Sequence, residues 1–341
     1  MSLPTPVRQG SKAFSLTKSA EQPVRTGSME ERSSRFGLFA RRKAADFWLN
    51  LLFWQTRRNP QFPVKTKPIF FLLTWKFAHL MRENTLCNSR RLLGSAASQS
   101  DQLSLARSTI GHFYDFICDV GRSVGQSREQ MLKRIEATEG HDNYLNARAA
   151  GKGAIVVTAH MGSFEVGIAA LLEHDKCVHV VFRKDAYGRF ERTRSALRQS
   201  LGVNEHCVDD GLAVWMRLRD ALTNDEVVLV QGDRVMPGQK GKRVAFMGGH
   251  MMLPTGPAKL ALASGAPIVP IFSVRRDDGQ IRLFVEEPIW VKSAEEVDEA
   301  ITKFAEILEQ YLRRFPDQWL MIQRAWCEDM TPVPEGAQAN L

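Results

Sequence analysis

The second half of the chain alternates between short β-branched apolar runs and amphipathic stretches of helical length. The strand-like runs are residues 154–158, 178–182, 204–208, 227–230, 267–272 and 281–285. The helix-like stretches between and after them are residues 166–172, 189–201, 212–222, 257–264 and 294–314. Such alternation predicts an α/β fold with a layered, largely parallel central sheet flanked by helices.

The N-terminal 35 residues are rich in Ser, Pro, Thr, Gln and charge and have few large apolar side chains. They cannot bury enough apolar surface to become ordered, so we expect a disordered basic tail. Residues 1–45 hold nine Lys or Arg and three Asp or Glu, or +6 of the net +8. This charge fits a solvated tail, an arm on an anionic membrane surface, or contact with nucleic acid. Nucleic acid is disfavoured, because no basic stripe interleaved with aromatics continues into the rest of the chain.

Residues 36–82 contain two aromatic-rich apolar stretches, 47–54 and 69–77, flanked or interrupted by Arg, Lys and His. Neither reaches the roughly 20 apolar residues that a membrane-spanning helix needs. Aromatic residues beside cations are typical of a helix lying in the lipid headgroup plane, and two buried core helices are the alternative. We therefore predict a membrane-surface segment at 36–82, an α/β domain at 83–330 whose first part is mostly helical, and a flexible tail at 331–341.

Five cysteines are spread widely along the chain, with no Cys-x-x-Cys pair and no zinc-like spacing. We expect reduced thiols in a cytosolic compartment and no metal or other cofactor. The first 30 residues also lack the apolar segment of a signal peptide.

The strongest chemical signal is His160 followed by Glu165, placed where the strand 154–158 ends and a helix begins. Ligands bind at such strand–helix junctions in open α/β sheets. A carboxylate on the first helical turn could hold one ring nitrogen and make the other a general base. Backbone amides of Gly162 and Ser163 could then stabilise an oxyanion. The alternative is a buried histidine beside a capping glutamate.

Further polar residues and glycines follow the later strands, and singly each is ordinary. Together they predict a substrate-binding edge of the sheet, because the carboxyl ends of parallel strands lie on one side and cations there suit phosphate or carboxylate headgroups. Asp233 is also placed to orient Arg234 or His160. The predicted substrate-binding residues are Arg183, Asp233, Arg234, Lys242, Arg243, Gly248, Thr255 and Gly256.

Several of these motifs, in this order, resemble the bacterial lipid A biosynthesis acyltransferases of the lysophospholipid acyltransferase superfamily. The resemblance covers about residues 36–330. The motifs that carry it are His160-x4-Glu165, Arg183, the 231–234 block, 246–248 with 254–257, 268–270, and Pro316-Asp317-Gln318-Trp319 with Arg324. The 231–234 block differs from the Asp-Gln-Asp common in lipid A enzymes, which leaves the acceptor open.

The resemblance implies a glycerolipid acyltransferase-like fold with N-terminal membrane-associating helices. It implies an O-acyltransferase that takes a fatty acyl chain from acyl carrier protein to a hydroxyl of a membrane lipid, a lipid A precursor. His160 would be the general base and Glu165 its partner. The expected location is the inner membrane, peripheral or monotopic, with the active site on the cytoplasmic side.

Three other functions remain compatible with the sequence. The acceptor could be a lysophospholipid or another glycolipid. A non-catalytic membrane-binding protein would be expected to have lost the His160 and Glu165 pair, which is present here. A hydrolase would normally carry an activated Ser or Cys, and Ser163 would be oddly placed beside His160 as its base.

Overall fold

The structure of the protein, a computed structural model, describes residues 43, 46–59, 62–183, 188–236 and 238–330. The chain divides into the units Met1–Ala44 and Ala45–Leu341, and all described residues except Lys43 belong to the second. Both predicted tails, residues 1–35 and 331–341, lie outside the described residues.

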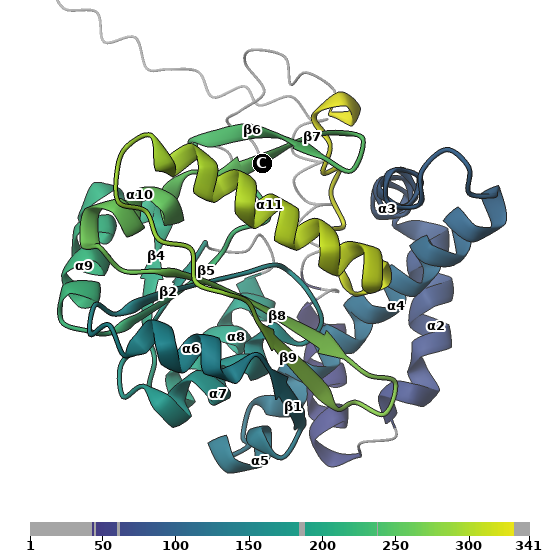
Figure 1. The fold of residues 1–341 in the computed structure, drawn as a ribbon. Coiled ribbons are helices and arrows are strands. Elements are labelled where there is room, and N and C mark those ends of the chain that lie inside the picture. The colour runs from purple at the N-terminus through teal and green to yellow at the C-terminus, as the bar shows by residue number, and fades with distance from the viewer. Residues whose placement is uncertain (1–42, 44–45, 60–61, 184–187, 237, 331–341) are drawn as a thin grey trace, which may run out of the picture. The chain divides into compact units, whose positions relative to one another are not determined.

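A seven-stranded sheet forms the centre of the second unit (Figure 1), in the order β1-β9-β8-β2-β5-β3-β4. The strands are β1 (Ile135–Glu139), β2 (Ala154–Thr158), β3 (Val178–Phe182), β4 (Asn204–Cys207), β5 (Val227–Gln231), β8 (Ile268–Arg275) and β9 (Ile281–Val285). Five neighbouring strands, from β8 to β4, run parallel. β9 pairs antiparallel with β8 and parallel with β1. The predicted α/β fold with a largely parallel sheet is confirmed.

Helices cover both faces of the sheet and one end of it. They are a helix at residues 46–58, α2 (Phe62–Phe77), α3 (His79–Leu93), α4 (Gln99–Ser123), α5 (Arg128–Leu132), α6 (His141–Arg148), α7 (Phe164–His174), α8 (Gly188–Ser200), α9 (Leu212–Thr223), α10 (Gly256–Ser264) and α11 (Glu296–Arg314). Short 3-10 turns are η1 (Val208–Asp210), η2 (Pro316–Gln318) and η3 (Cys327–Asp329).

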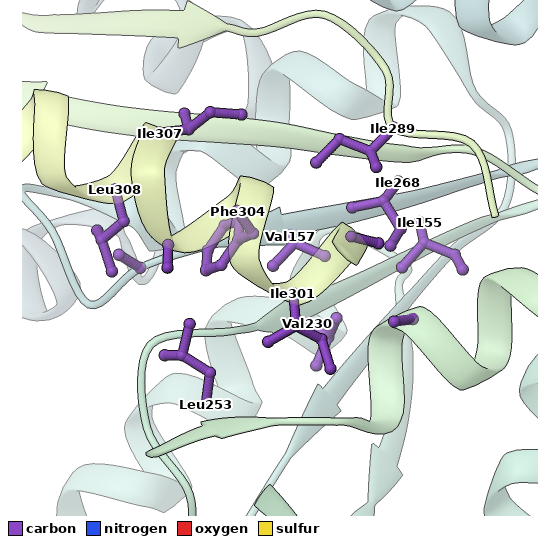
Figure 2. Packing of buried hydrophobic residues seen from close by; sticks show 14 of the residues in the cluster. Ile155, Val157, Val230, Leu253, Ile268, Ile289, Ile301, Phe304, Ile307 and Leu308 are labelled. Atoms are coloured by element: carbon purple, nitrogen blue, oxygen red, sulfur yellow. The ribbon is translucent and has the colours of Figure 1, made fainter. Parts of the chain in front are cut away.

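The side chains of β2 alternate between two apolar clusters, because successive residues of a strand point to opposite faces. Ile155 and Val157 pack with residues of α9, α10 and α11. Ala154 and Val156 pack with residues of α6 and α7 on the other face. Figure 2 shows Phe304 of α11 close to Val157 in the first cluster. Both faces of the strand are buried, which explains its continuous apolar sequence.

Two segments differ from the prediction. β1 lies in a region predicted as mostly helical, and residues 241–254, where no strand is predicted, form a hairpin of β6 (Gly241–Phe246) and β7 (Gly249–Pro254). Its two turn residues, Met247 and Gly248, have φ of 44° and 77°. Positive φ at both positions is the geometry of the tight turn that matches strand twist.

The N-terminal helices present much apolar surface. α2 has no buried residue, so the alternative of a buried core helix is wrong for α2. The helix at 46–58 is anchored by Phe53, which is 2% exposed and packs so closely on Gly121 that a Cβ there would lie 2.3 Å from its ring. Within the described part of the chain, no helix is both long and apolar enough to cross a bilayer.

Candidate active site

The register of the sheet brings His160 and Asp233 together. β2 and β5 run parallel with Thr158 opposite Gln231, and each of the two residues lies two positions beyond that pair. His160 Nδ1 lies 2.8 Å from Asp233 Oδ1. Two side chains that are 73 residues apart in the chain thus meet at the carboxyl edge of the sheet, where open α/β sheets bind ligands.

Asp233 is completely buried and accepts three hydrogen bonds. Its Oδ1 accepts from His160 Nδ1, and its Oδ2 accepts from the His160 backbone N–H at 3.0 Å and from Trp319 Nε1 at 2.9 Å. Burial alone would raise the pKa of Asp233, but attraction to His160 and these hydrogen bonds lower it to about 2. An ionised carboxylate cannot donate, so the Nδ1 that faces it carries the proton.

The other ring nitrogen of His160, Nε2, has no hydrogen-bond partner among the described residues. The side chain is 21% exposed, and its ring stands edge-on to Phe164 with centroids 5.8 Å apart. With the proton fixed on Nδ1, Nε2 presents a lone pair. The arrangement can therefore accept a proton from a bound hydroxyl.

The segment after α11 closes over the turn that carries His160. Leu320 N–H donates to the His160 carbonyl at 2.7 Å, and Gly162 N–H donates to the Gln318 carbonyl at 3.0 Å. Asn88 of α3 in turn donates to the carbonyls of Met321 and Gln323. The Gln-Trp motif at 318–319 thus holds the backbone and the carboxylate partner of His160 in place.

Glu165 does not contact His160, so the predicted pairing of these two residues is wrong. Its Oε1 accepts from Arg194 Nε at 2.5 Å and from Arg198 Nη1 at 3.2 Å, both on α8. The side chain is buried, at 3% exposure. The physical reason is the tight turn at Gly162, after which Glu165 on the first turn of α7 faces α8, while the strand register supplies Asp233 to the histidine.

The predicted oxyanion amides are only partly available. Gly162 has a φ of 55°, and a Cβ there would lie 2.4 Å from the Ser273 carbonyl, so the turn requires glycine. Its N–H already donates to Gln318, which contradicts the predicted oxyanion role. The N–H of Ser163 has no acceptor among the described residues, while its hydroxyl donates to Asp119. The oxyanion role of Ser163 stays a prediction.

The predicted cationic residues each have a polar neighbour. Arg183 pairs with Asp209 at 3.1 Å. Lys242 and Arg243, both on β6, pair with Asp298 at 2.9 Å and Glu328 at 3.2 Å, respectively. Arg234 directly follows Asp233 and donates from Nη1 to Gln323 Oε1 at 3.3 Å, while its buried Nε has no partner among the described residues. Binding of substrate by these four residues stays a prediction.

The remaining predicted residues shape the backbone near the hairpin. Gly248 forms its turn. Thr255 N–H donates to the Lys240 carbonyl at 3.2 Å, and a Cβ on Gly256 would lie 2.6 Å from the Trp215 ring. Their contact with substrate stays a prediction.

A cavity of about 540 Å³ lies between the sheet and α7. Phe164, whose ring packs against His160, lines it together with apolar side chains that include Val156, Ile168, Leu229 and Ile271. Its far part is polar and contains His141 and His174, whose Nε2 atoms lie 2.9 Å apart. Volumes of this size are typical of sites for small ligands.

Residues 38–328 match the model of the family described as bacterial lipid A biosynthesis acyltransferase. The chain belongs to this family. Among similar proteins, the phosphatidylinositol mannoside acyltransferase of Mycolicibacterium smegmatis is 26% identical over 56% of this chain and 62% of its own length. Those of Mycobacterium tuberculosis strains CDC 1551 and H37Rv are each 25% identical, over 62% and 60% of this chain and 67% and 65% of their own lengths. The chain thus spans about two thirds of the length of these relatives, which are named, like the family, as acyltransferases.

Two features of this family member's site could not be assigned from its sequence motifs alone. Asp233 was one of several residues expected at the sheet edge, with Arg234 or His160 as its partner, and strand order decides between them. Trp319 ends the motif Pro316-Asp317-Gln318-Trp319, but the motif predicts no role for it. In the structure its Nε1 donates a hydrogen bond to Asp233. The available signal was position, since His160 follows the apolar run 154–158 by two residues and Asp233 follows the run 227–230 by three.

Proposed function

We propose that the protein is an O-acyltransferase that moves a fatty acyl chain from a thioester on acyl carrier protein to a hydroxyl of a membrane lipid. The observation that carries this proposal is the pairing of His160 Nδ1 with ionised Asp233, which leaves Nε2 unbonded among the described residues. The His160 ring packs against Phe164, which lines a largely apolar cavity. Membership in the acyltransferase family supports the same reaction.

In the proposed reaction, His160 Nε2 takes the proton of the acceptor hydroxyl as its oxygen attacks the thioester carbonyl carbon. The new C–O bond forms and a tetrahedral oxyanion develops. We propose that the N–H of Ser163, the residue just before α7, stabilises this oxyanion. The C–S bond then breaks, and the imidazolium returns its proton to the leaving thiolate. Asp233 holds the ring and stabilises the imidazolium, and such base assistance contributes about 10²–10⁴-fold to the rate.

We assign the 540 Å³ cavity to the acyl chain. Support comes from its lining, which includes aliphatic side chains of the sheet and of α7. Phe164 lines the cavity and packs against the His160 ring, so we place the thioester end of the chain at the Phe164 end of the cavity. We propose Arg234 as a contact for the phosphate of the acceptor, because it follows Asp233 and has a buried Nε without a partner among the described residues.

We further propose that the enzyme works at the cytoplasmic face of the inner membrane as a peripheral or monotopic protein. The helix at 46–58 exposes Trp48 at 64%, and α2 exposes Leu72 at 64% and Phe77 at 66%. Arg58 stacks over the ring of Trp54 at 4.4 Å. Exposed aromatic and aliphatic side chains beside cations fit a helix in an anionic headgroup layer.

The acceptor we propose is a lipid A precursor, following the family description. The names of the mycobacterial relatives favour a second candidate, a phosphatidylinositol mannoside-like glycolipid. Both are lipids with sugar hydroxyls, so the proposed chemistry is the same for either.

Mass spectrometry of membrane lipids separates these acceptors. Lipids are compared between a strain lacking the gene and strains complemented with the wild type or with His160→Ala. One lipid class should lose an acyl chain in the deletion strain, regain it with the wild type and not with the variant. Restoration by His160→Ala would refute the proposed chemistry, and the identity of the lipid that changes names the acceptor.

Flotation with vesicles containing anionic lipid tests the proposed membrane surface. Leu72→Asp should reduce the bound fraction several-fold, because it puts a charge into the apolar surface of α2. Leu212→Asp on α9, where the wild-type side chain is 76% exposed, is the matched control and should bind as the wild type does. Equal binding of both variants and the wild type would contradict the proposal.

A further inference from the structure

A second polar cluster lies at the amino edge of the sheet, where β3 and β5 begin. Cys177 precedes β3, His179 is its second residue, and Glu226 precedes β5. Cys177 Sγ lies 3.5 Å from His179 Nε2, which lies 2.6 Å from Glu226 Oε2. One ligand atom from each of the three residues lies within 4.8 Å of the other two.

We propose that Cys177, His179 and Glu226 bind a Zn²⁺ ion. Tetrahedral zinc with bonds of about 2.3 Å to sulfur and about 2.0 Å to nitrogen places these two atoms roughly 3.5 Å apart. The Sγ–Nε2 distance in the protein has this value. The carboxylate must move back by less than about 1 Å to admit the ion, and the Glu226 side chain is free enough to do so at 30% exposure.

The neighbours of the cluster orient its ligand atoms. His179 Nδ1 lies 2.8 Å from His206 Nε2, so one of these two ring nitrogens donates a hydrogen bond and the other accepts it. When His206 accepts, His179 carries its proton on Nδ1 and turns the Nε2 lone pair toward the Glu226 oxygen. Two acceptors that close need a proton or a cation between them. Histidines that bind zinc typically donate their other ring N–H to an acceptor, as His179 would to His206.

The Cys177 sulfur also has a hydrogen-bond donor beside it. Asn204 Nδ2 donates to Cys177 Sγ at 3.2 Å, which suits a thiolate. Burial, with a contribution from Glu226, raises the pKa of the Cys177 thiol, so binding must displace its proton. Thiolate and imidazole together favour zinc over magnesium or calcium, and water can reach the partly exposed Cys177 to complete the coordination.

The proposed ion would join the segment before β3 to the amino end of β5. The five residues of β5, about 16 Å of strand, separate it from the edge that carries His160 and Asp233. A role in stability rather than in acyl transfer follows from this separation, so the proposal stands independently of the proposed reaction.

Zinc binding by the untagged, purified full-length protein tests the proposal. Affinity is measured by competition with a chelating dye, and thiolate coordination by the sulfur-to-metal absorption of the Co²⁺ form. We expect about one ion per chain, release of about one proton on binding at pH 7, and a zinc-dependent rise in Tm. Cys177→Ser should abolish the cobalt band and weaken zinc at least tenfold, and His206→Ala should weaken it about 10–100-fold.

Two further variants keep the outcome decisive. Cys327→Ser removes another partly exposed thiol that lies outside the cluster, and it should bind zinc as the wild type does. Glu226→Gln keeps the side-chain size and should also weaken binding at least tenfold. Circular dichroism and Tm in chelator establish that each variant is folded. Wild-type affinity in folded Cys177→Ser or Glu226→Gln, or no binding by the wild type, would overturn the proposal.

Discussion

Asp233→Asn removes one charge and almost no volume from the site, and its effect follows from the hydrogen bonds around that side chain. Oδ2 accepts two hydrogen bonds, from the His160 backbone and from Trp319. The asparagine must place its carbonyl oxygen there to keep both. Its amide nitrogen then faces His160 Nδ1 and donates to it, so the ring proton moves to Nε2. The nitrogen that faces the substrate can no longer accept a proton.

The expected loss in turnover is therefore most of the contribution of general base catalysis, about 10²–10⁴-fold. This corresponds to about 3–5 kcal/mol in the activation free energy. In serine proteases, changing the aspartate that binds the catalytic histidine to asparagine reverses the tautomer in the same way. That change lowers turnover by about 10⁴-fold. Since two of the three hydrogen bonds are kept, the variant should remain folded.

The assay is release of the carrier thiol from acyl carrier protein in the presence of the lipid acceptor, with purified protein at saturating donor. Asp220→Asn, an exposed aspartate paired with Arg219, is the matched control and should keep wild-type turnover. A folded Asp233→Asn variant with turnover within threefold of the wild type would refute the argument about the tautomer.

Four further predictions concern the surroundings of the site. Glu165→Gln should lower the free energy of unfolding, measured by urea denaturation, by about 1–3 kcal/mol, because it removes a negative charge that pairs with buried Arg198. Turnover of the folded protein should fall less than tenfold. Trp319→Phe removes a hydrogen bond to a charged group and should cost about 1.5–3 kcal/mol in the same assay and lower turnover. Gly167→Met, where a Cβ meets only one side-chain atom, at 3.6 Å, should fill the cavity and shift donor preference toward shorter acyl chains in competition assays. Because the pKa of Asp233 falls from 3.8 to about 2 on folding, its stabilisation is complete above pH 3.8 and lost as the pH falls through about 2, so Asp233→Asn should flatten that part of an acid-unfolding curve.

The layered sheet was predictable because its strands are short, apolar and separated by helices of regular period. β2, β3 and β9 have the predicted bounds, and β4, β5 and β8 differ by one to three residues at an end. β1 was missed because its sequence, Ile-Glu-Ala-Thr-Glu, is mixed in polarity and lies at the sheet edge. The β6–β7 hairpin was missed because its turn is Met-Gly, without the Asn or Asp that usually marks such turns.

The partner of His160 could not be fixed from local spacing. Glu165 is close to His160 in the chain, and its spacing fits a dyad. The direction of its side chain, however, depends on how α7 leaves the turn at Gly162. Asp233 is remote in the chain and becomes a neighbour only because β5 is adjacent to β2. Strand order is a property of the whole sheet. Local spacing therefore predicts Glu165 as the partner, and the sheet supplies Asp233 instead.

The single-turnover rate of His160→Ala tests the central claim most directly. Purified variant and wild type are mixed with acyl carrier protein bearing a labelled acyl chain and with membrane lipid, and the label on lipid is followed with time. If Nε2 of His160 takes the hydroxyl proton, the variant transfers label about 10²–10⁴-fold more slowly at an unchanged Tm. A folded variant that labels lipid at nearly the wild-type rate would contradict the assignment of His160 as the base.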